Sequence, residues 1–370
     1  MKYYIIAGEA SGDLHGSNLM KELYKKDPNA DIRFWGGDLM TAAGGTLVKH
    51  YRELAFMGFI EVIFNLKTIL GNIKICKKDI LNFQPDVLIF IDYPGFNMRI
   101  AKWAKVLGMK THYYISPQIW AWKESRITDI KRDVDKMYVI LPFEKKFYEE
   151  KHNFPVEFVG HPLIDAIHNN PKIDSALFRK ENQLNDKPII AILPGSRKQE
   201  ITKMLSVMLS VVHDFPDYQF VIAGAPSQDF SFYKDFITQD NIKFISNKTY
   251  DLLSNATAAL VTSGTATLET ALFKVPEVVC YKGSWASYQI AKRIITLKYI
   301  SLVNLIMDEE VVTELIQEDC NEKKIKEELL KILNPIHRNT LLEKYALLEQ
   351  QLGGIGASAK TAELIVNDLK

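Results

Sequence analysis

The sequence has few cysteines and almost no net charge, and each scarcity excludes a class of protein. Cys76, Cys280 and Cys320 form no C-x-x-C pair and lie at no metal-ligand spacing from a histidine. The 46 basic and 45 acidic residues leave a net charge of +1, whereas a dedicated nucleic-acid-binding protein usually carries a strong basic excess. We therefore expect a cytoplasmic protein that binds no nucleic acid, no metal ion and no cofactor.

Long apolar runs and several common nucleotide motifs are also missing. No run reaches the roughly 18 apolar residues that span a bilayer, and the chain reaches Glu9 too early for a signal peptide. The sequence contains no Walker A loop and no G-x-G-x-x-G fingerprint. No D-x-D motif follows a predicted strand. We expect a soluble chain that lies at most on a membrane surface.

The 370 residues, 47% of them hydrophobic, are sufficient for two domains with separate cores. Short apolar runs alternate with helix-length segments, which is typical of doubly wound α/β sheets. The predicted strands are 3–7, 87–91, 110–115, 137–141, 188–193, 219–223, 242–245, 258–262 and 277–281. We place the domains at 1–165 and 166–335. The helices of 336–370 are expected to pack back on the first domain or on a second subunit of a homodimer, and the sequence leaves both open.

Two glycine turns in the second half each join a predicted strand to a predicted helix. Free amides at a helix start bind phosphate, and a guanidinium adds a fixed positive charge. Each turn alone is also compatible with an ordinary strand-to-helix connection, but the pair favours a nucleoside diphosphate. Glu269 is placed to accept ribose hydroxyls, or is an acid favoured by the helix dipole. The turns contain Gly195, Ser196 and Arg197, and Ser263, Gly264, Thr265, Ala266 and Thr267.

The strand ends of the first half carry acids instead. Glu9 and Asp13 follow strand 3–7 and would repel a phosphate, so sugar hydroxyls are the expected ligands, although Asp13 also suits a helix cap. Asp92 ends strand 87–91, where its carboxylate is suited to accept the proton of an attacking hydroxyl or to cap the next helix. Trp120 follows strand 110–115 and is expected in sugar stacking, in a lid or in the core.

An apolar stretch between residues 54 and 70 is followed by several lysines. Such a segment is able to lie in a membrane interface, with its apolar face toward the lipid and its lysines toward anionic head groups. Its periodicity also fits a core helix of the first domain. The residues expected to face the membrane are Phe56, Met57, Phe59, Ile60, Ile63 and Phe64.

These motifs together resemble the lipid-A-disaccharide synthases, inverting glycosyltransferases of the GT-B fold. The resemblance covers nearly the whole chain, and its most specific elements are S-P-Q-x-W-A-W and P-G-S-R. The matching segments are 8–13 (G-E-A-S-G-D), 57–59 (M-G-F), 116–122 (S-P-Q-I-W-A-W), 141–144 (L-P-F-E), 158–162 (F-V-G-H-P), 193–197 (L-P-G-S-R), 263–269 (S-G-T-A-T-L-E), 291–293 (A-K-R), 299–304 (Y-I-S-L-V-N) and 314–318 (E-L-I-Q-E).

The resemblance implies two Rossmann-like domains facing across a cleft, and a hexosyltransferase at the inner face of the inner membrane. It implies transfer of 2,3-diacylglucosamine from UDP-2,3-diacylglucosamine to 2,3-diacylglucosamine 1-phosphate (lipid X), forming a β-1,6 disaccharide and UDP. The second domain would hold UDP, with Arg197 stabilising the pyrophosphate, and Asn304 and Gln317 would contact the donor. The acceptor would contact Ser11, Gly12, Asp13, Asn97, Gln118 and Trp120.

The sequence departs from the family pattern at one position that bears on the mechanism. Many family members have an acid where this chain has Gly95, so a base role for that acid does not carry over. Asp92 is the first candidate for the base, Glu9 is the second, and Asp13 is the third. A UDP-sugar epimerase on the same scaffold and a non-catalytic nucleotide-sugar-binding protein at the membrane remain the alternative functions.

Overall fold

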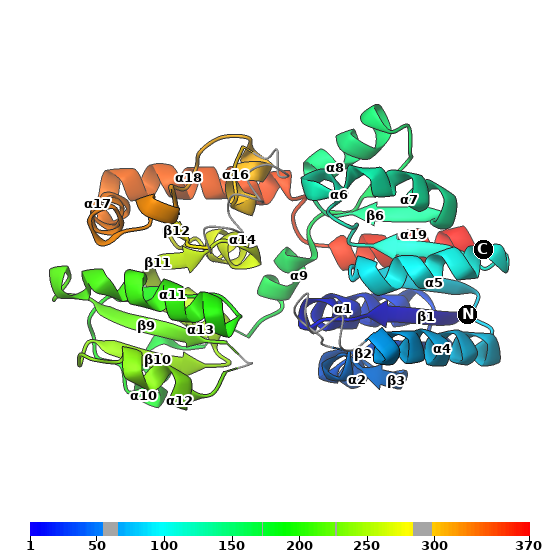
Figure 1. Cartoon of the computed structure of the whole chain (residues 1–370), viewed down its shortest axis with the longest axis horizontal. Coiled ribbons are helices and arrows are strands. Elements are labelled where there is room, and N and C mark those ends of the chain that lie inside the picture. The colour runs from blue at the N-terminus through cyan, green and yellow to red at the C-terminus, as the bar shows by residue number, and fades with distance from the viewer. Residues whose placement is uncertain (55–65, 172, 226–227, 284–297) are drawn as a thin grey trace. The chain divides into compact units, whose positions relative to one another are not determined.

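The protein is described by a computed structural model that covers residues 1–54, 66–171, 173–225, 228–283 and 298–370. Its contacts divide the chain into two units (Figure 1). Unit 1 contains Met1–His168 with Leu352–Lys370, and unit 2 contains Asn169–Gln351. The expected C-terminal segment 336–370 is therefore shared between the two units.

Unit 1 is built on a seven-stranded sheet in the order β3-β2-β1-β4-β5-β6-β7, in which all pairs are parallel. The strands are β1 (Lys2–Ala7), β2 (Asp31–Gly36), β3 (Thr46–His50), β4 (Val87–Ile91), β5 (Thr111–Tyr114), β6 (Lys136–Val139) and β7 (Glu157–Phe158). The helices are α1 (Ala10–Lys26), α2 (Asp38–Ala43), α4 (Leu66–Phe83), α5 (Pro94–Val106), α6 (Ile119–Trp122), α7 (Ile127–Asp133), α8 (Pro142–Lys146), α9 (Pro162–His168) and α19 (Ala357–Leu369).

Unit 2 repeats this architecture with a six-stranded parallel sheet in the order β10-β9-β8-β11-β12-β13. The strands are β8 (Ile189–Leu193), β9 (Gln219–Gly224), β10 (Ile242–Ser246), β11 (Ala256–Thr262), β12 (Glu277–Tyr281) and β13 (Glu314–Ile316). The helices are α10 (Ser175–Glu181), α11 (Lys198–Met208), α12 (Phe230–Tyr233), α13 (Thr249–Asn255), α14 (Thr265–Leu272), α16 (Leu302–Met307), α17 (Glu322–Leu333) and α18 (Pro335–Gln351).

The apolar runs predict most of the strands in both sheets. All nine predicted strands are present, with ends displaced by at most two residues. Strands β4 and β8 are buried at every position, as expected for parallel strands covered on both faces. In unit 1, Tyr4 and Phe90 pack with Ile80 of α4 and Ile100 of α5 on one face of the sheet. The two-domain α/β prediction is therefore confirmed.

The strand order reverses once in each sheet, and this reversal positions the candidate sites. In unit 1 it lies between β1 and β4, and in unit 2 between β8 and β11. Connections from two such neighbouring strands leave toward opposite sides of the sheet, which opens a crevice beyond their carboxyl ends. Ligands of doubly wound proteins bind at this point, so the residues after these four strands are the first to consider.

The expected membrane-facing residues lie outside the part of the chain that the structure describes. This applies to Phe56, Met57, Phe59, Ile60, Ile63 and Phe64. Among the described helices, none is both long and apolar enough to cross a bilayer.

The C-terminal helix α19 returns to unit 1, where it packs against α1. In Figure 1 this red helix lies beside the blue and cyan elements of the unit. The buried carboxylate of Asp165 accepts hydrogen bonds from the backbone N–H groups of Gly356 (2.6 Å) and Ser358 (2.9 Å) at the start of α19. Asp165 thus satisfies two amides that the helix itself leaves unpaired.

Replacement of Asp165 is expected to weaken the attachment of α19. Asp165→Ala removes two charge-assisted hydrogen bonds from a buried position, so it should destabilise the docked helix by about 2 kcal/mol. Hydrogen exchange of the α19 amides measures this change. Asp174→Ala is the matched control because Asp174 caps α10 of unit 2 from an exposed position. Equal protection of α19 in wild type and Asp165→Ala would contradict the role of Asp165.

Candidate functional site

A cavity of about 490 Å³ lies beyond the carboxyl ends of β8, β9 and β11 in unit 2. This volume is within the range of small-molecule sites. Eight of the predicted nucleotide-binding residues line it: Gly195, Ser196, Arg197, Ser263, Gly264, Thr265, Ala266 and Glu269. Thr267, Asn304 and Gln317 are absent from its lining. The structure therefore brings together both glycine turns at the reversal of the strand order.

The turn after β8 requires glycine at position 195. Gly195 has a φ of +102°, and a Cβ atom at this position would lie 2.2 Å from Oε2 of Glu200. The same carboxylate accepts a hydrogen bond from the backbone N–H of Ser196 at 3.2 Å. Glu200 lines the cavity but was not predicted from the sequence, because an acid in the first turn of a helix is common without any ligand. The exposed Arg197 is the N-cap residue of α11.

The turn after β11 presents small residues and hydroxyl groups to the cavity. Gly264 is the N-cap residue of α14, with a φ of +150°, and a Cβ atom at this position would meet nothing within 4 Å. Thr262 is buried, and its Oγ1 has no hydrogen-bond partner within the described residues. The hydroxyl of Ser263 donates to the carbonyl of Ile300, and that of Thr267 donates to the carbonyl of Gly264. Thr267 therefore stabilises the turn from behind.

Glu269 reaches the cavity from the second turn of α14. Its Oε1 accepts a hydrogen bond of 3.1 Å from the hydroxyl of Tyr250. Burial raises the pKa of Glu269, and the bond from Tyr250 partly opposes this effect. Tyr250 was not predicted, although it lies in the first turn of α13, the helix that follows β10. A carboxyl oriented in this way is suited to accept hydroxyl groups of a ribose.

Asn304 and Gln317 have different surroundings. The side-chain amide of Asn304 is fully buried and donates to the carbonyl of Val312 and to Glu314. Its oxygen accepts the backbone N–H groups of Val311 and Val312. Asn304 therefore holds the backbone of Val311 and Val312, which precede β13. Gln317 follows β13 with a φ of +54°, and its Nε2 is buried without a partner in the described structure. Contact of either residue with a donor stays a prediction.

In unit 1, the turn after β4 has a strained backbone. Asp92 and Tyr93 have φ angles of 44° and 48°, a region that non-glycine residues rarely adopt. The carbonyl of Asp92 accepts hydrogen bonds from Nδ2 of the buried Asn97 (2.7 Å) and from the hydroxyl of Tyr113 (2.6 Å). Gly8 leaves room for the turn, since a Cβ there would lie 2.2 Å from the ring of Tyr93. Such strain persists where its surroundings enforce it, and it clusters at functional sites.

The two candidate bases lie after adjacent strands. Ala7 of β1 pairs with Ile91 of β4 in the sheet. Asp92 directly follows Ile91, and Glu9 follows Ala7 after Gly8. Burial raises the pKa of Asp92 to about 6, and the negative charge of Glu9 contributes to this shift. Glu9 itself is exposed at the N-cap of α1. Near pH 7 Asp92 is thus an ionised carboxylate with increased basicity.

Asp13 is engaged with the backbone of a neighbouring helix. Its buried carboxylate accepts N–H groups from Gly37 (2.7 Å), Leu39 (3.1 Å) and Met40 (3.0 Å) at the start of α2. It therefore caps α2, which follows it in the chain, and not α1, which contains it. Beside it, Ser11 is exposed and Gly12 is buried against Ala7.

The loop after β5 is held by a buried acid. Oε1 of Glu144 in α8 accepts hydrogen bonds from the hydroxyl of Ser116 and from Nε1 of Trp120 (3.1 Å). Its other oxygen accepts the backbone N–H groups of Ile140 and Leu141, and burial raises its pKa. Gln118, between the two anchored residues, is exposed. Glu144 was not predicted as a site residue, because only the fold brings it to this loop.

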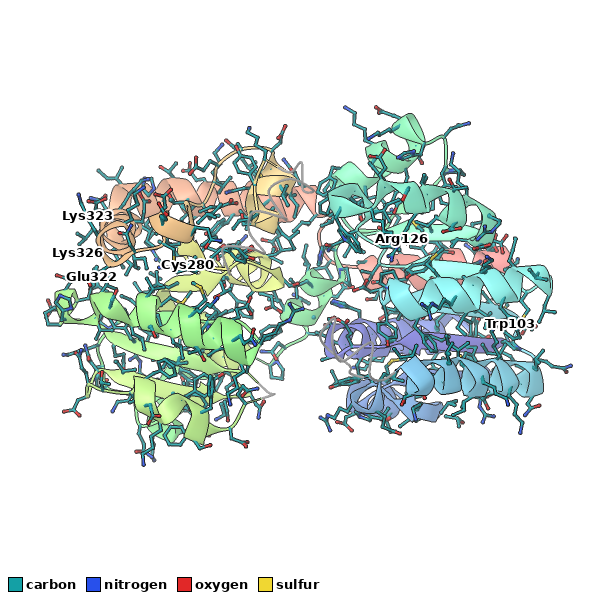
Figure 2. All side chains as sticks on the ribbon, viewed as in Figure 1. Trp103, Arg126, Cys280, Glu322, Lys323 and Lys326 are labelled. Atoms are coloured by element: carbon teal, nitrogen blue, oxygen red, sulfur yellow. The ribbon has the colours of Figure 1, made fainter. Side chains whose placement is uncertain are left out.

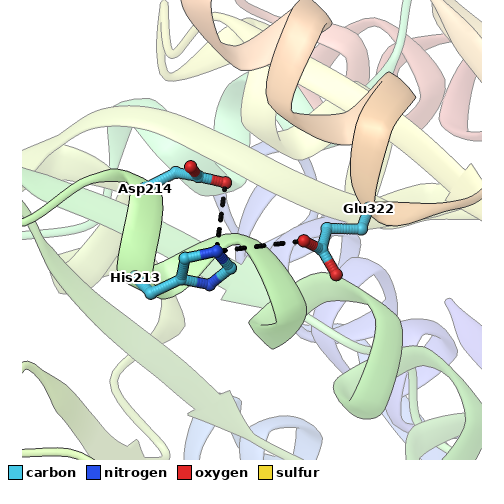
Figure 3. Close-up of side chains that lie close together, drawn as sticks. All are labelled: His213, Asp214 and Glu322. Carbon is cyan, nitrogen blue, oxygen red and sulfur yellow. Dashed lines mark ion pairs between the residues drawn. The ribbon is translucent and has the colours of Figure 1, made fainter.

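One group of possible metal ligands occurs among the described residues, and it lies apart from these sites. Figure 3 shows the imidazole of His213 close to the carboxylates of Asp214 (3.6 Å) and Glu322 (3.9 Å). Lys326 also pairs with Asp214, so a cation already neutralises that acid. None of these residues lines the 490 Å³ cavity. Ion pairs that join His213 and Asp214 to Glu322 and Lys326 of α17 account for this cluster.

Comparison with solved structures supports the fold. The UDP-GlcNAc 2-epimerase from Neisseria meningitidis, in a crystal structure with UDP-GlcNAc, has a TM-score of 0.69 at 14% identity. The alignment covers 99% of this chain and 100% of the epimerase. A glycosyltransferase of kitacinnamycin has a TM-score of 0.66 at 13% identity, covering 100% of this chain and 99% of that protein. These similarities show the GT-B fold alone, because the identities are low.

Comparison of sequences identifies the family. A family model described as lipid-A-disaccharide synthetase matches residues 3–362. The lipid-A-disaccharide synthase of Syntrophus aciditrophicus is 40% identical over 99% of this chain and 97% of its own length, and that of Geobacter metallireducens is 38% identical over 99% and 96%. These matches span both units, and the shared name is that of a hexosyltransferase of lipid A biosynthesis. The chain belongs to the lipid-A-disaccharide synthase family.

Proposed function

We propose that the protein transfers 2,3-diacylglucosamine from UDP-2,3-diacylglucosamine to the 6-hydroxyl of 2,3-diacylglucosamine 1-phosphate (lipid X), with inversion. The products are a β-1,6-linked disaccharide 1-phosphate and UDP. The observation that carries the proposal is that the residues after the strands differ between the two units. Unit 2 offers a cavity formed by two glycine turns, and unit 1 offers a carboxylate of raised pKa at the corresponding position.

The donor nucleotide is assigned to the cavity of unit 2. Helices α11 and α14 begin at its two glycine turns, so their free amides and positive dipole ends favour the diphosphate. Arg197 adds a guanidinium at the start of α11, and Glu269 is placed to accept the ribose hydroxyls. The solved epimerase with UDP-GlcNAc on this fold supports the same class of ligand.

The acceptor is assigned to unit 1, with Asp92 as the base. The 6-hydroxyl oxygen attacks the anomeric carbon of the donor while the bond from that carbon to the diphosphate oxygen breaks. Asp92 takes the hydroxyl proton, and Arg197 with the helix amides stabilises the negative charge on the departing UDP. Asn97 and Tyr113 act as positioning residues, because they hold the Asp92 carbonyl and not a reacting atom.

The site of action is assigned to the cytoplasmic surface of the inner membrane, where both acylated sugars are held. Helix α4 supports this location because Leu70 and Ile75 are exposed beside the exposed Lys74 and Lys78. Apolar residues next to lysines favour an anionic lipid surface.

The reaction is tested by dependence on acceptor. Purified protein is incubated with UDP-2,3-diacylglucosamine with and without lipid X, and products are identified by mass spectrometry. UDP release and a disaccharide 1-phosphate should form only when both substrates are present. Conversion of the donor without acceptor would favour epimerisation. Tight UDP binding without any product would favour a non-catalytic binding protein.

Removal of the guanidinium at the start of α11 should slow the reaction strongly. Arg197→Ala is expected to lower kcat by about a hundredfold, the effect of losing one donor to a transition-state charge. Lys198→Ala is the matched control, because Lys198 is the next exposed cation and is absent from the cavity lining. Steady-state rates and circular dichroism of both variants provide the measurement. A near-normal rate for Arg197→Ala would remove this role.

The pH profile should report the carboxyl of Asp92. Protonated Asp92 cannot accept a proton, so kcat/KM should fall by about tenfold per pH unit as the pH drops below about 6. Asp92→Asn should lower the rate and abolish this acidic limb. Glu9→Gln should keep activity and move the limb to lower pH, because the Glu9 charge helps to raise the pKa of Asp92. An inactive Glu9→Gln beside an active Asp92→Asn would assign the base to Glu9.

A further inference from the structure

A second cavity, of about 180 Å³, lies in unit 1 at the same edge of the sheet as Asp92. It is formed by the start of α5, by α7 and by the loop after β5. We call it the arginine cavity, and its lining residues are Pro94, Gly95, Met98, Arg99, Pro117, Arg126, Asp129 and Ile130. The cavity is too small for a nucleotide but has room for a phosphate group with a few waters.

The charges in this cavity are unbalanced in favour of an anion. Neither Arg99 nor Arg126 forms an ion pair within the described residues. The one acid in the lining, Asp129, is paired with Arg132 at 2.8 Å, outside the cavity lining. Two guanidinium groups therefore share one small cavity without a carboxylate of their own.

Arg126 is held in place by a contact that leaves its hydrogen-bond donors available. Its guanidinium carbon lies 5.2 Å from the centre of the Trp122 ring, and the residue is located between α5 and α7 (Figure 2). A guanidinium that stacks on an aromatic face keeps its N–H groups directed outward from its edge. A half-buried arginine of this kind is suited to bidentate binding of a phosphate.

The backbone around the arginine cavity also favours the binding of an anion. Helix α5 has 13 residues and begins at Pro94, so its positive dipole end lies at the lining residues Pro94 and Gly95. Pro94 has no N–H group, so the backbone donor at this end of the lining is the N–H of Gly95. Gly95 is exposed, and a Cβ atom there would meet nothing within 4 Å, so this side of the cavity is open. The arginines carry the anion preference, and the helix start reinforces it.

We propose that the arginine cavity binds the phosphate monoester of the acceptor sugar; this rests on the proposed function. In a glucosamine 1-phosphate, the carbon bearing the phosphate and the carbon bearing the 6-hydroxymethyl group both neighbour the ring oxygen. A phosphate bound beside Pro94 therefore keeps the 6-hydroxyl on the side of Asp92, two residues earlier in the chain. Arg99 and Arg126 select the phosphorylated sugar as acceptor and orient its hydroxyl toward the base.

The proposal is tested by comparing lipid X with 2,3-diacylglucosamine, the same acceptor without phosphate. The variants are Arg99→Gln, Arg126→Gln and the double variant. Each single variant should raise the KM for lipid X by about tenfold, as expected for one lost charge-assisted contact. The KM for the unphosphorylated acceptor and the KM for the donor should stay unchanged. Lys102→Gln is the control, because Lys102 is an exposed cation of α5 outside the cavity lining.

The preference of the enzyme for lipid X over 2,3-diacylglucosamine tests this proposal separately from the proposed function. If wild type forms product and the double variant keeps the full preference for lipid X, the arginine cavity is not the phosphate site. If wild type forms no product with either acceptor, the proposed function fails, and a titration with glucosamine 1-phosphate followed by NMR of the arginine side chains decides the cavity. Binding by wild type with loss in the double variant supports the site, and equal binding or none overturns it.

A lipid head group is the other source of such a phosphate, and vesicles distinguish it. Binding to vesicles of phosphatidylglycerol should be the same for wild type, the double variant and Lys102→Gln. If the double variant lost vesicle binding and kept its preference for lipid X, the arginines would serve the membrane and the proposal would be overturned.

Discussion

The parallel pairing of the first and fourth strands in each sheet is the constraint on which both candidate sites depend. Ala7 pairs with Ile91 in unit 1, and Leu193 pairs with Val261 in unit 2. Because paired parallel strands end at one edge, the turns after them become neighbours although the paired ends are 84 residues apart in unit 1 and 68 in unit 2. Without this pairing, neither the two glycine turns of unit 2 nor the two acids of unit 1 would meet.

The same architecture supports opposite chemistry in the two units because the residues at the strand ends differ. In unit 2, two helices begin at the glycine turns that line the cavity, and Arg197 lies at the start of one of them, which favours an anion. In unit 1, the acids Glu9 and Asp92 occupy the corresponding ends, which favours removal of a proton. Arg99 and Arg126, to which we assign the phosphate of the acceptor, line a separate cavity of unit 1 that does not include Glu9 or Asp92.

Buried strands and the glycine turns were predictable from the sequence, because each has a local signal. Strands β2, β3, β7 and β13 were not predicted, since β2 and β3 carry charged residues and β7 and β13 have only two and three residues. The partners of site residues were also missed. Only the fold brings Glu200 to the unit 2 cavity, Tyr250 to the cavity residue Glu269, and Glu144 to the loop after β5. The sequence pattern shows which residue is polar, but it does not show from which groups that residue accepts hydrogen bonds.

The C-terminal helix α19 completes unit 1 after the whole of unit 2 has been made. Residues 169–351 are therefore an insertion between α9 and α19, the helix whose first N–H groups bind Asp165. On the ribosome, the surface of α1 that α19 covers stays open to water or to chaperones until residues 357–369 have been synthesised. Unit 2 is thus the first to be able to fold completely, and unit 1, begun earlier, is finished last.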